Sequence, residues 1–389
     1  MPKRIAVVAA TVLAAAGLSV PAASAAPHML VGINDEANTL YGDPDANFPI
    51  LKQLRVQVLR VNLYWGGTRY GVAATRPENP TDPADPAYDW TLYDRFVRFA
   101  SQYGIKVLFS ILFTPSWANG DQGPRSAPKN FADLQKFAYA AAKRYSGSYV
   151  PPLDQQDSTN GTSGLPLPAV RFWTAWNEPN NPIWLTPQYK RVAGTWVMVG
   201  AQNYAKICNA VYAGVHQTLI SSEKVACGVT GPRGNDSPRS SRASVDPLSF
   251  MRALKRYGMK RFDVYGHHPY YGAPSESPAY IPKDNAVQLG NINVLLAQLS
   301  KLWGRKHLWI TEYGYQTTPQ DKLFGVTWAK QAQYLTQAFA IARRNPRIDM
   351  MLWFMLRDDT NISVGWQSGL LTARGQKKPA FAAFQRLPH

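Results

Sequence analysis

Cysteine is almost absent from this chain, which contains only Cys208 and Cys227. Neither cysteine stands beside a His/Asp arrangement, which argues against a thiol nucleophile and against a cysteine-based metal site. Cys208 falls in a predicted helix and Cys227 in the strand that follows it. A disulfide between helix and strand and a pair of buried free thiols both fit this placement.

Acidic residues are also few: 25 Asp and Glu stand against 42 Lys and Arg, which gives a formal net charge of +17. Such a charge favours anionic partners, including nucleic acids, acidic glycans and anionic wall polymers. The basic residues are scattered, however, and form no cluster or motif typical of nucleic-acid binding. We therefore expect no nucleic-acid partner and interpret the charge as a soluble basic surface or as attraction to anionic wall polymers.

Long apolar runs are missing after the first residues, so we expect no membrane-spanning helix in the rest of the chain. The first residues have the pattern of a signal peptide, with basic Lys3 and Arg4, an Ala-rich apolar stretch over 5–20 and an Ala-Ser-Ala tripeptide before the cut. We predict cleavage after Ala25 and secretion, and an uncleaved anchor is the alternative. Residues 26–389 would then form one mature catalytic domain, which we expect to be a monomer.

Apolar strand-like runs alternate with amphipathic helical stretches along the mature chain. Strands are expected at 29–34, 58–64, 106–113, 170–176, 224–229, 262–266, 307–312 and 350–356. Helices are expected at 47–53, 90–103, 131–145, 195–219, 247–257, 291–303, 327–343 and 379–387. The polar stretch 146–168 resembles a domain linker but carries no change of pattern, so we interpret it as a surface loop with an unmodified sequon at 160–162. The order predicts an α/β protein, a single (β/α)8 TIM barrel.

Two glutamates stand at the ends of two apolar runs, Glu178 after the fourth predicted strand and Glu312 at the end of the seventh. A carboxylate in such a place is costly to bury unless it has partners or a function. Strands four and seven face each other across an eight-stranded barrel, and barrel chemistry lies where strands end. Two carboxylates that meet there are the minimum equipment for cleaving a glycosidic bond. Taken singly, Glu178 could instead cap a helix and Glu312 could form a strand-end salt bridge.

The residues around these glutamates carry a family resemblance. Asn177-Glu178-Pro179 and Thr311-Glu312-Tyr313-Gly314 are similar to the signatures of glycoside hydrolase clan A, a group of retaining (β/α)8 enzymes that includes families 5 and 39. The closing segments 368–373 and 378–381 also resemble that clan, and 114–118 leans toward family 39. The resemblance covers nearly the whole mature chain. It implies that Glu178 is the acid/base, that Glu312 is the nucleophile and that no metal or cofactor takes part.

Other positions match the clan by resemblance. Arg60 resembles the arginine that holds the nucleophile, and Trp353 resembles the tryptophan beneath the reacting sugar, although it could simply fill the barrel. His268 and Tyr270 share one face of an extended chain. Tyr270 would donate to Glu312, and His268 would bind substrate or tune the acid, with the adjacent His267 as the alternative.

Polar and aromatic neighbours complete the expected substrate site. Asn177 would bind a sugar hydroxyl next to the cleaved bond. Loop tryptophans suit a carbohydrate cleft because sugar C–H faces stack on aromatic rings, and plain packing is the alternative for each. They are Trp65, Trp117, Trp184 and Trp366, and Trp117 is the one we assign to the substrate. A metal site at His267 and His268 lacks further clustered ligands.

These patterns predict a secreted retaining glycoside hydrolase that acts on a β-linked oligo- or polysaccharide. The alternative is a catalytically inactive cell-wall or glycan-binding protein on the same barrel. Inactive relatives of enzymes usually lose a catalytic carboxylate, and this chain keeps both Glu178 and Glu312. The sequence leaves open the sugar, the linkage and the choice between terminal and internal cleavage.

Overall fold

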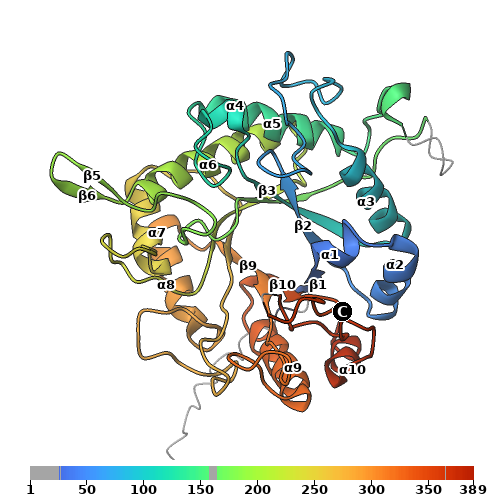
Figure 1. Cartoon of the computed structure of the whole chain (residues 1–389), viewed down its shortest axis with the longest axis vertical. Coiled ribbons are helices and arrows are strands. Elements are labelled where there is room, and N and C mark those ends of the chain that lie inside the picture. Colours follow the sequence, from blue (N-terminus) through green and yellow to red (C-terminus); the bar gives the residue numbers. More distant parts are fainter. Residues whose placement is uncertain (1–25, 27, 157–163, 364) are drawn as a thin grey trace, which may run out of the picture.

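Eight parallel strands close into a barrel in the computed structural model of this chain, which describes residues 26, 28–156, 164–363 and 365–389 (Figure 1). The strands are β1 (Leu30–Asn34), β2 (Val58–Tyr64), β3 (Lys106–Leu112), β4 (Phe172–Ala175), β7 (Lys224–Thr230), β8 (Val264–His267), β9 (His307–Tyr313) and β10 (Ile348–Phe354). Each barrel strand pairs with the next one along the chain, and β10 returns to pair with β1. The predicted (β/α)8 barrel is therefore confirmed.

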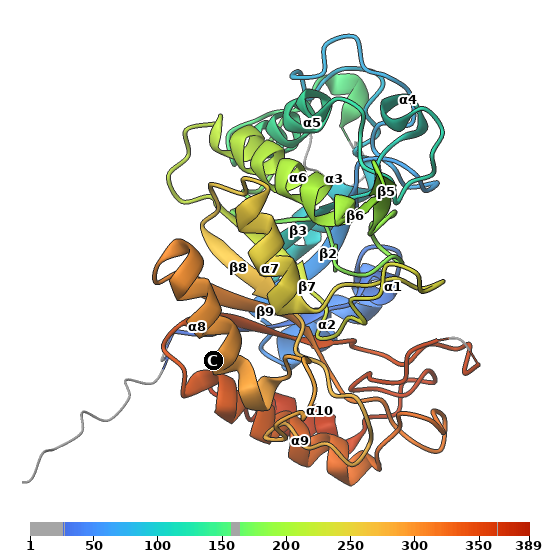
Figure 2. The ribbon, with the colours of Figure 1, turned by 90° about the vertical axis from the view of Figure 1, so that its left-hand side faces the viewer.

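Helices cover the outside of the barrel (Figure 2). The longer ones are α2 (Pro44–Gln53), α3 (Thr91–Gln102), α5 (Phe131–Arg144), α6 (Val199–His216), α7 (Pro247–Arg256), α8 (Ile292–Trp303), α9 (Trp328–Arg343) and α10 (Pro379–Gln385). Side-chain caps fix where several of them begin: Asp246 accepts hydrogen bonds from the amides of Leu248 and Ser249 at the start of α7. Such caps satisfy amide groups that the helix itself leaves unpaired.

The inside of the barrel has an apolar layer below a polar one. The apolar layer consists of Val58, Leu108, Ala226, Val264, Trp309, Met350 and Leu352. Side chains alternate along a strand, so a residue two positions later points into the same interior. On β2, β3 and β9 this rule places Arg60, Ser110 and Thr311 above the apolar layer. The polar layer lies at the carboxyl ends of the strands, where both glutamates were expected.

The prediction of one helix over 195–219 is wrong at its start. Residues Lys190–Val192 (β5) and Thr195–Val197 (β6) form a two-stranded antiparallel hairpin instead, and α6 begins only at Val199. The turn between them places Ala193 and Gly194 at φ values of 46° and 81°. Such positive φ values are typical of tight hairpin turns and incompatible with a continuing helix. Two short helices, α1 (Glu36–Thr39) and α4 (Ser116–Asn119), were also missed.

A disulfide joins Cys208 in α6 to Cys227 in β7, at a sequence separation of 19 positions. It settles the choice that the sequence left open between a disulfide and two free thiols.

Two predictions concern segments outside the described residues: the signal peptide over 1–25 and the sequon at 160–162. Within the described part of the chain, none of the helices has the length and apolarity needed to cross a membrane.

Glu223 is a fully buried carboxylate at the start of β7. Its Oε2 accepts a hydrogen bond from the hydroxyl of Thr218 at 2.6 Å, whereas its Oε1 has no partner among the described residues. Burial raises the pKa of Glu223 from 4.5 to about 7, and the Thr218 hydrogen bond only partly offsets this effect. The folded protein therefore binds a proton at Glu223 that the unfolded chain releases, and this stabilisation is lost as the pH rises through 7.

Replacing Glu223 with Gln is expected to remove this pH dependence. The unfolding free energy of Glu223→Gln minus that of the wild type should be about 2–3 kcal/mol larger at pH 8 than at pH 5. One pKa unit corresponds to about 1.4 kcal/mol, and the pKa of Glu223 is raised by more than one unit. Urea denaturation of both proteins at the two pH values measures the difference. A difference that stays constant with pH would contradict the raised pKa.

Candidate active site

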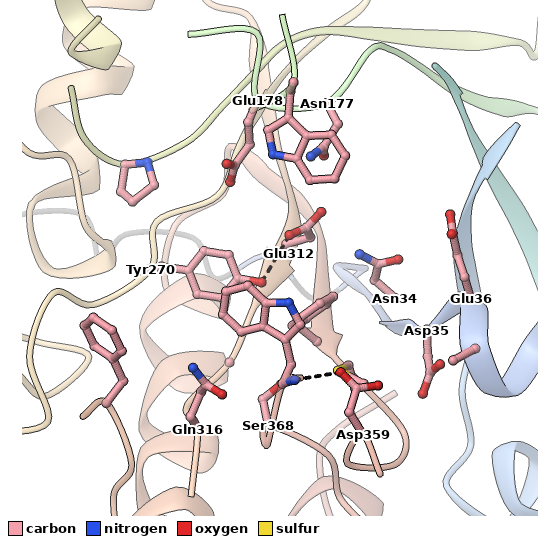
Figure 3. Close-up of a pocket in the computed structure, with 18 of the residues that line it drawn as sticks. Asn34, Asp35, Glu36, Asn177, Glu178, Tyr270, Glu312, Gln316, Asp359 and Ser368 are labelled. Atoms are coloured by element: carbon pink, nitrogen blue, oxygen red, sulfur yellow. Dashed lines mark hydrogen bonds between the residues drawn. The ribbon is translucent and has the colours of Figure 1, made fainter. Parts of the chain in front are cut away.

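A cavity of about 640 Å³ opens at the carboxyl ends of the barrel strands (Figure 3). Both predicted glutamates line it, Glu178 from the loop after β4 and Glu312 from β9. Its other polar or charged lining residues are Asn34, Asp35, Glu36, Asn62, Asn177, Arg233, Gln316, Asp359 and Ser368. Its aromatic lining residues are Tyr64, Trp184, Tyr270, Tyr271, Phe324, Phe354 and Trp366. A cavity of this size, with aromatic walls and a few polar groups, is typical of a small-molecule site.

The two glutamates meet across this cavity. A carboxylate oxygen of Glu178 and one of Glu312 lie within 4.8 Å of each other, and one ring nitrogen of His268 lies within the same distance of both. The two side chains remain 14% and 13% exposed, so each reaches the cavity from an otherwise buried position. A separation of at most 4.8 Å between these oxygens is compatible with the spacing of about 5–5.5 Å in retaining glycosidases and shorter than the roughly 6.5–9.5 Å of inverting ones.

Glu312 is held by cationic and hydroxyl donors. Arg60 Nη1 lies 2.5 Å from Glu312 Oε1, and the hydroxyl of Tyr270 donates to Oε2 at 3.2 Å. Arg60 itself is buried and fixed by hydrogen bonds to Ser110 Oγ at 2.8 Å and to Asn177 Oδ1 at 2.6 Å. Burial by itself would raise the pKa of Glu312, but the charges of His268 and Arg60 and the hydrogen bonds from Arg60 and Tyr270 hold it below its ordinary value. The site thus keeps Glu312 ionised, as a nucleophile requires.

Glu178 stands on a strained turn. Trp176 and Glu178 have φ values of 69° and 34°, which non-glycine residues rarely adopt. The backbone N–H of Glu178 donates to the carbonyl of Val229 at the end of β7, so the turn stays joined to the barrel. A Cβ atom at Gly231 would lie 3.1 Å from Oε2 of Glu178. Backbone strain of this kind is concentrated at functional sites, where surrounding contacts fix a side chain in one position.

His268, rather than His267, belongs to the site. Its Nδ1 lies 3.0 Å from Glu178 Oε1, and its Nε2 lies 2.8 Å from Thr311 Oγ1. His267 points away, with its ring nitrogens at Thr230 Oγ1 and at the carbonyl of Val287. Burial lowers the pKa of His267 to about 3, so this ring stays neutral and serves the packing. The structure therefore decides between the two histidines that the sequence left as alternatives.

Glu178, His268 and Glu312 also have the composition of a small metal site. The guanidinium of Arg60 opposes a cation there, because it places a positive charge against Glu312. Close opposition of a cation to a cation is unfavourable in a partly buried site. The same groups fit a proton-transferring pair.

The wall formed by β1, β2 and the segment after β1 contains residues that the sequence analysis missed. Oε1 of Glu36 accepts a hydrogen bond from the amide of Asn62 at 2.5 Å, and its Oε2 accepts one from the hydroxyl of Tyr64 at 3.0 Å. Burial raises the pKa of Glu36 to about 7, against the smaller effects of these donors and of Arg60. The sequence contained a signal for these residues, because Asn34, Asp35 and Glu36 stand at the end of an apolar strand, as Glu178 does.

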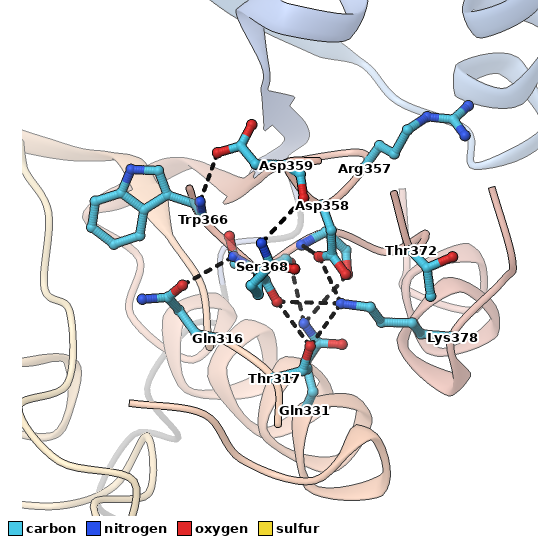
Figure 4. Close-up of polar contacts among 12 residues, drawn as sticks. Gln316, Thr317, Gln331, Arg357, Asp358, Asp359, Trp366, Ser368, Thr372 and Lys378 are labelled. Carbon is cyan, nitrogen blue, oxygen red and sulfur yellow. Dashed lines mark hydrogen bonds and ion pairs between the residues drawn. The ribbon is translucent and has the colours of Figure 1, made fainter. Parts of the chain in front are cut away.

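The loop after β10 forms the opposite part of the rim and is fixed by a buried ion pair (Figure 4). Lys378 Nζ donates to Asp358 Oδ1 at 2.7 Å, to Thr317 Oγ1 at 2.9 Å and to the carbonyl of Gln367 at 3.2 Å. All three ammonium hydrogens are therefore used. The loop carries Trp366, whose amide donates to Asp359 Oδ2 and whose ring lies at the cavity mouth, 51% exposed. A satisfied buried network of this kind holds the rim in one position.

Two tryptophans assigned to substrate binding lie elsewhere. Trp353 is fully buried, donates to the carbonyl of Ser368 and is not among the residues that line the cavity, and its assignment to the substrate stays a prediction. Trp117 also lies outside the cavity lining, packs edge-on against Trp65 and donates to the carbonyl of Ala73. Trp184 and Trp366 are the loop tryptophans that reach the cavity.

Comparison with known families supports the resemblance that the motifs carry. Residues 279–384, which include Glu312 and the whole loop after β10, match the family model described as glycosyl hydrolase catalytic core. The predicted resemblance to a glycosyl hydrolase is confirmed. No curated protein sequence matches the chain.

Solved glycosidase structures share the fold. A glucosidase from Croceicoccus marinus is 14% identical with a TM-score of 0.62, and the match covers 91% of this chain and 64% of that one. A family 39 glycoside hydrolase from Bacteroides cellulosilyticus is 18% identical with a TM-score of 0.58, over 92% of this chain and 63% of that one. A Penicillium canescens endo-1,4-β-xylanase is 15% identical with a TM-score of 0.54, over 91% and 92%. This chain thus spans less than two thirds of the first two structures.

Removing the hydroxyl of Tyr270 should shift the ionisation of Glu312. Tyr270→Phe deletes a donor that lowers the pKa of Glu312, so that pKa should rise and the acid limb of kcat/KM should move to higher pH. A hydrogen bond to a charged group is worth about 1.5–3 kcal/mol, which corresponds to a loss of about tenfold or more in kcat/KM. The pH–rate profile checks this, with Tyr88→Phe as the matched control because its hydroxyl donates to Pro80, outside the cavity. An unmoved acid limb would contradict the assignment.

Proposed function

We propose that this protein is a secreted retaining glycoside hydrolase that uses Glu178 as acid/base and Glu312 as nucleophile. The observation that carries the proposal is the approach of the two carboxylates to within 4.8 Å, one of them clamped by Arg60. The glycosyl hydrolase match over 279–384 and the glycosidase folds of similar structures support the same reaction class. Secretion rests on the signal-peptide pattern before residue 26.

The first step transfers the sugar to the protein. Glu178 gives its proton to the glycosidic oxygen while Oε of Glu312 attacks the anomeric carbon, so the bond to the leaving group breaks as the glycosyl ester forms. Glu312 enters this step ionised because Arg60 and Tyr270 donate to its two oxygens. Asn177 lies beside the pair, bound to Arg60, where it can reach a hydroxyl group of the reacting sugar.

The second step releases the sugar. Glu178, now a carboxylate, takes a proton from water, and the resulting oxygen attacks the anomeric carbon and displaces Glu312. His268 lies 3.0 Å from Glu178 and 3.7 Å from Glu312, so it contacts the acid/base in both steps. Two displacements at one carbon restore the configuration of the substrate, which is what retention means.

The substrate proposed is a β-linked oligo- or polysaccharide. Structures with this fold include a fungal β-1,4-galactanase, an endo-1,4-β-xylanase and a β-glucuronidase, so the fold alone does not choose a sugar. The basic chain, with its net charge of +17, would favour approach to anionic wall material that surrounds such a polymer. We propose a monomer without a metal or cofactor.

The test is release of reducing sugar from β-linked glucan, mannan, xylan and galactan and from the matching nitrophenyl glycosides. The mature protein is assayed beside Glu312→Ala. Release by the wild type alone supports the hydrolase, and the responsive substrate gives the sugar. Binding without release from any substrate would favour the inactive glycan-binding alternative.

A further inference from the structure

The charge inside the cavity is opposite to that of the whole chain. Five carboxylate side chains line it, namely Asp35, Glu36, Glu178, Glu312 and Asp359. Among the described lining residues Arg233 is the only basic one, and its guanidinium already contacts the carbonyl of Tyr271 at 3.1 Å and Glu276 at 3.5 Å. A substrate carboxylate would therefore meet five carboxylates in this cavity and one cation, Arg233, which is already paired with Glu276. The chain as a whole, by contrast, carries a net charge of +17.

The two-step reaction does not use three of the cavity carboxylates. Asp35 caps α1 and Asp359 accepts a hydrogen bond from the amide of Trp366, which leaves Glu36. It lies across the cavity from Tyr270, next to Asn34 (Figure 3). The amide of Asn62 and the hydroxyl of Tyr64 each donate to one of its oxygens, which fixes the plane of the group. A carboxylate has about four acceptor positions, so about two remain for a ligand. No Lys, Arg or His of the described residues forms an ion pair with it.

We propose that Glu36 determines specificity, accepting hydrogen bonds from adjacent hydroxyl groups of an uncharged sugar unit and rejecting a uronate at that position. The inference rests on the proposed glycosidase function and adds a substrate class to it. Neighbouring sugar hydroxyls donate well to a fixed carboxylate, because hydrogen bonds to a charged acceptor are the strong ones. A uronate would bring a second carboxylate against Glu36 in a partly desolvated site, where like charges repel most.

The raised pKa of Glu36 predicts that uronate rejection depends on pH. Burial raises its pKa to about 7, so it becomes fully charged only above neutral pH. The titratable or charged groups near it are Asp35 beside it, Tyr41 after α1, Arg60 and Tyr64 on β2, and Tyr93 on α3. The three tyrosines have raised pKa values and stay neutral between pH 6 and pH 8. Rejection of uronates should therefore strengthen from pH 6 to pH 8, and lose this dependence when Glu36 is replaced by Gln.

Binding, rather than turnover, is the direct test. Calorimetry measures binding to Glu312→Ala, in which the sugars stay intact. The ligands are cellotriose, xylotriose, β-1,4-mannotriose, β-1,4-galactotriose and the β-1,4-linked uronate trimannuronate. The same titrations use the double variants Glu36→Gln/Glu312→Ala and Glu78→Gln/Glu312→Ala. Glu78 is an exposed glutamate outside the cavity lining, so its replacement makes the same charge change elsewhere. Gln at position 36 keeps the shape and one acceptor oxygen, and circular dichroism verifies folding.

We expect at least one uncharged trisaccharide to bind and trimannuronate to bind at least tenfold more weakly. Glu36→Gln should lower the affinity for the uncharged trisaccharide about tenfold or more and reduce the difference in affinity between this ligand and the uronate. Glu78→Gln should leave both affinities unchanged. The proposal would be overturned if the uronate bound more tightly than the uncharged trisaccharides, or if the two Gln variants had equal effects. It would also be overturned if no uncharged probe bound. Hydrolysis by the wild type is scored separately, so a hydrolase whose specificity ignores Glu36 is distinguishable from a protein that is not a hydrolase.

Discussion

Replacing Glu312 with Ala is expected to abolish turnover while the protein stays folded. The carboxylate of Glu312 forms the bond to the anomeric carbon. Among the described residues, Glu178 is the one other carboxylate in the group whose atoms lie within 4.8 Å of one another and of His268. Loss of a nucleophile typically costs about four orders of magnitude or more in kcat, which corresponds to about 5.5 kcal/mol of activation free energy. Hydrolysis of the responsive substrate, measured with purified variant and wild type, gives the loss.

Two controls separate chemistry from stability in this experiment. Glu78→Ala removes an exposed glutamate outside the cavity and should leave kcat unchanged. Added azide should restore some turnover of Glu312→Ala with an activated glycoside, because a small anion fits the space that the carboxylate leaves and can attack the same carbon. Turnover by the variant at the wild-type rate would remove Glu312 from the mechanism.

Replacing Glu178 with Gln is expected to give a loss that depends on the leaving group. A poor leaving group such as a sugar hydroxyl needs the proton of Glu178, so kcat/KM should fall about 10²–10⁴-fold. A dinitrophenolate needs no proton, so kcat/KM for that glycoside should remain near the wild-type value. Without a base for the second step the glycosyl ester should accumulate, which lowers kcat and KM together.

The comparison of leaving groups distinguishes an acid from a residue that only supports the fold. A structural role for Glu178 would lower kcat/KM equally for good and poor leaving groups. Glu78→Gln makes the matched change outside the site and should leave both rates unchanged.

The barrel and its catalytic pair were accessible from the sequence because each depends on a simple repeated pattern. Strand runs such as 58–64 and 307–312 are apolar and bounded by turn residues, and a polar side chain after such a run stands out. Glu178 and Glu312 stand out in this way, as does Arg60 inside β2. That the two side chains face one cavity then follows from the position of their strands in a closed eight-stranded barrel.

Other features depend on loop conformation, which local patterns do not encode. Asp35 and Glu36 carry the same signal as Glu178, an acidic residue after an apolar strand, but the four-residue helix that Asp35 caps and that places Glu36 in the cavity is too short to leave a periodic pattern. Trp117 was assigned to the substrate because aromatic rings suit sugars, and Trp353 because of its resemblance to the clan's tryptophan. In the structure Trp117 packs against Trp65, Trp353 is fully buried, and neither lines the cavity. The β5–β6 hairpin was missed because its second strand joins an apolar helix without a break in hydrophobicity.

The configuration of the first product tests the central claim most directly. Proton NMR during the first minutes of hydrolysis of a β-glycoside distinguishes the β-anomer from the α-anomer before mutarotation mixes them. The account predicts that the β-anomer is released first, because carboxylates within 4.8 Å of each other leave room for a glycosyl ester and not for an inverting water. Initial release of the α-anomer would contradict Glu312 as a nucleophile and with it the mechanism proposed for this cavity.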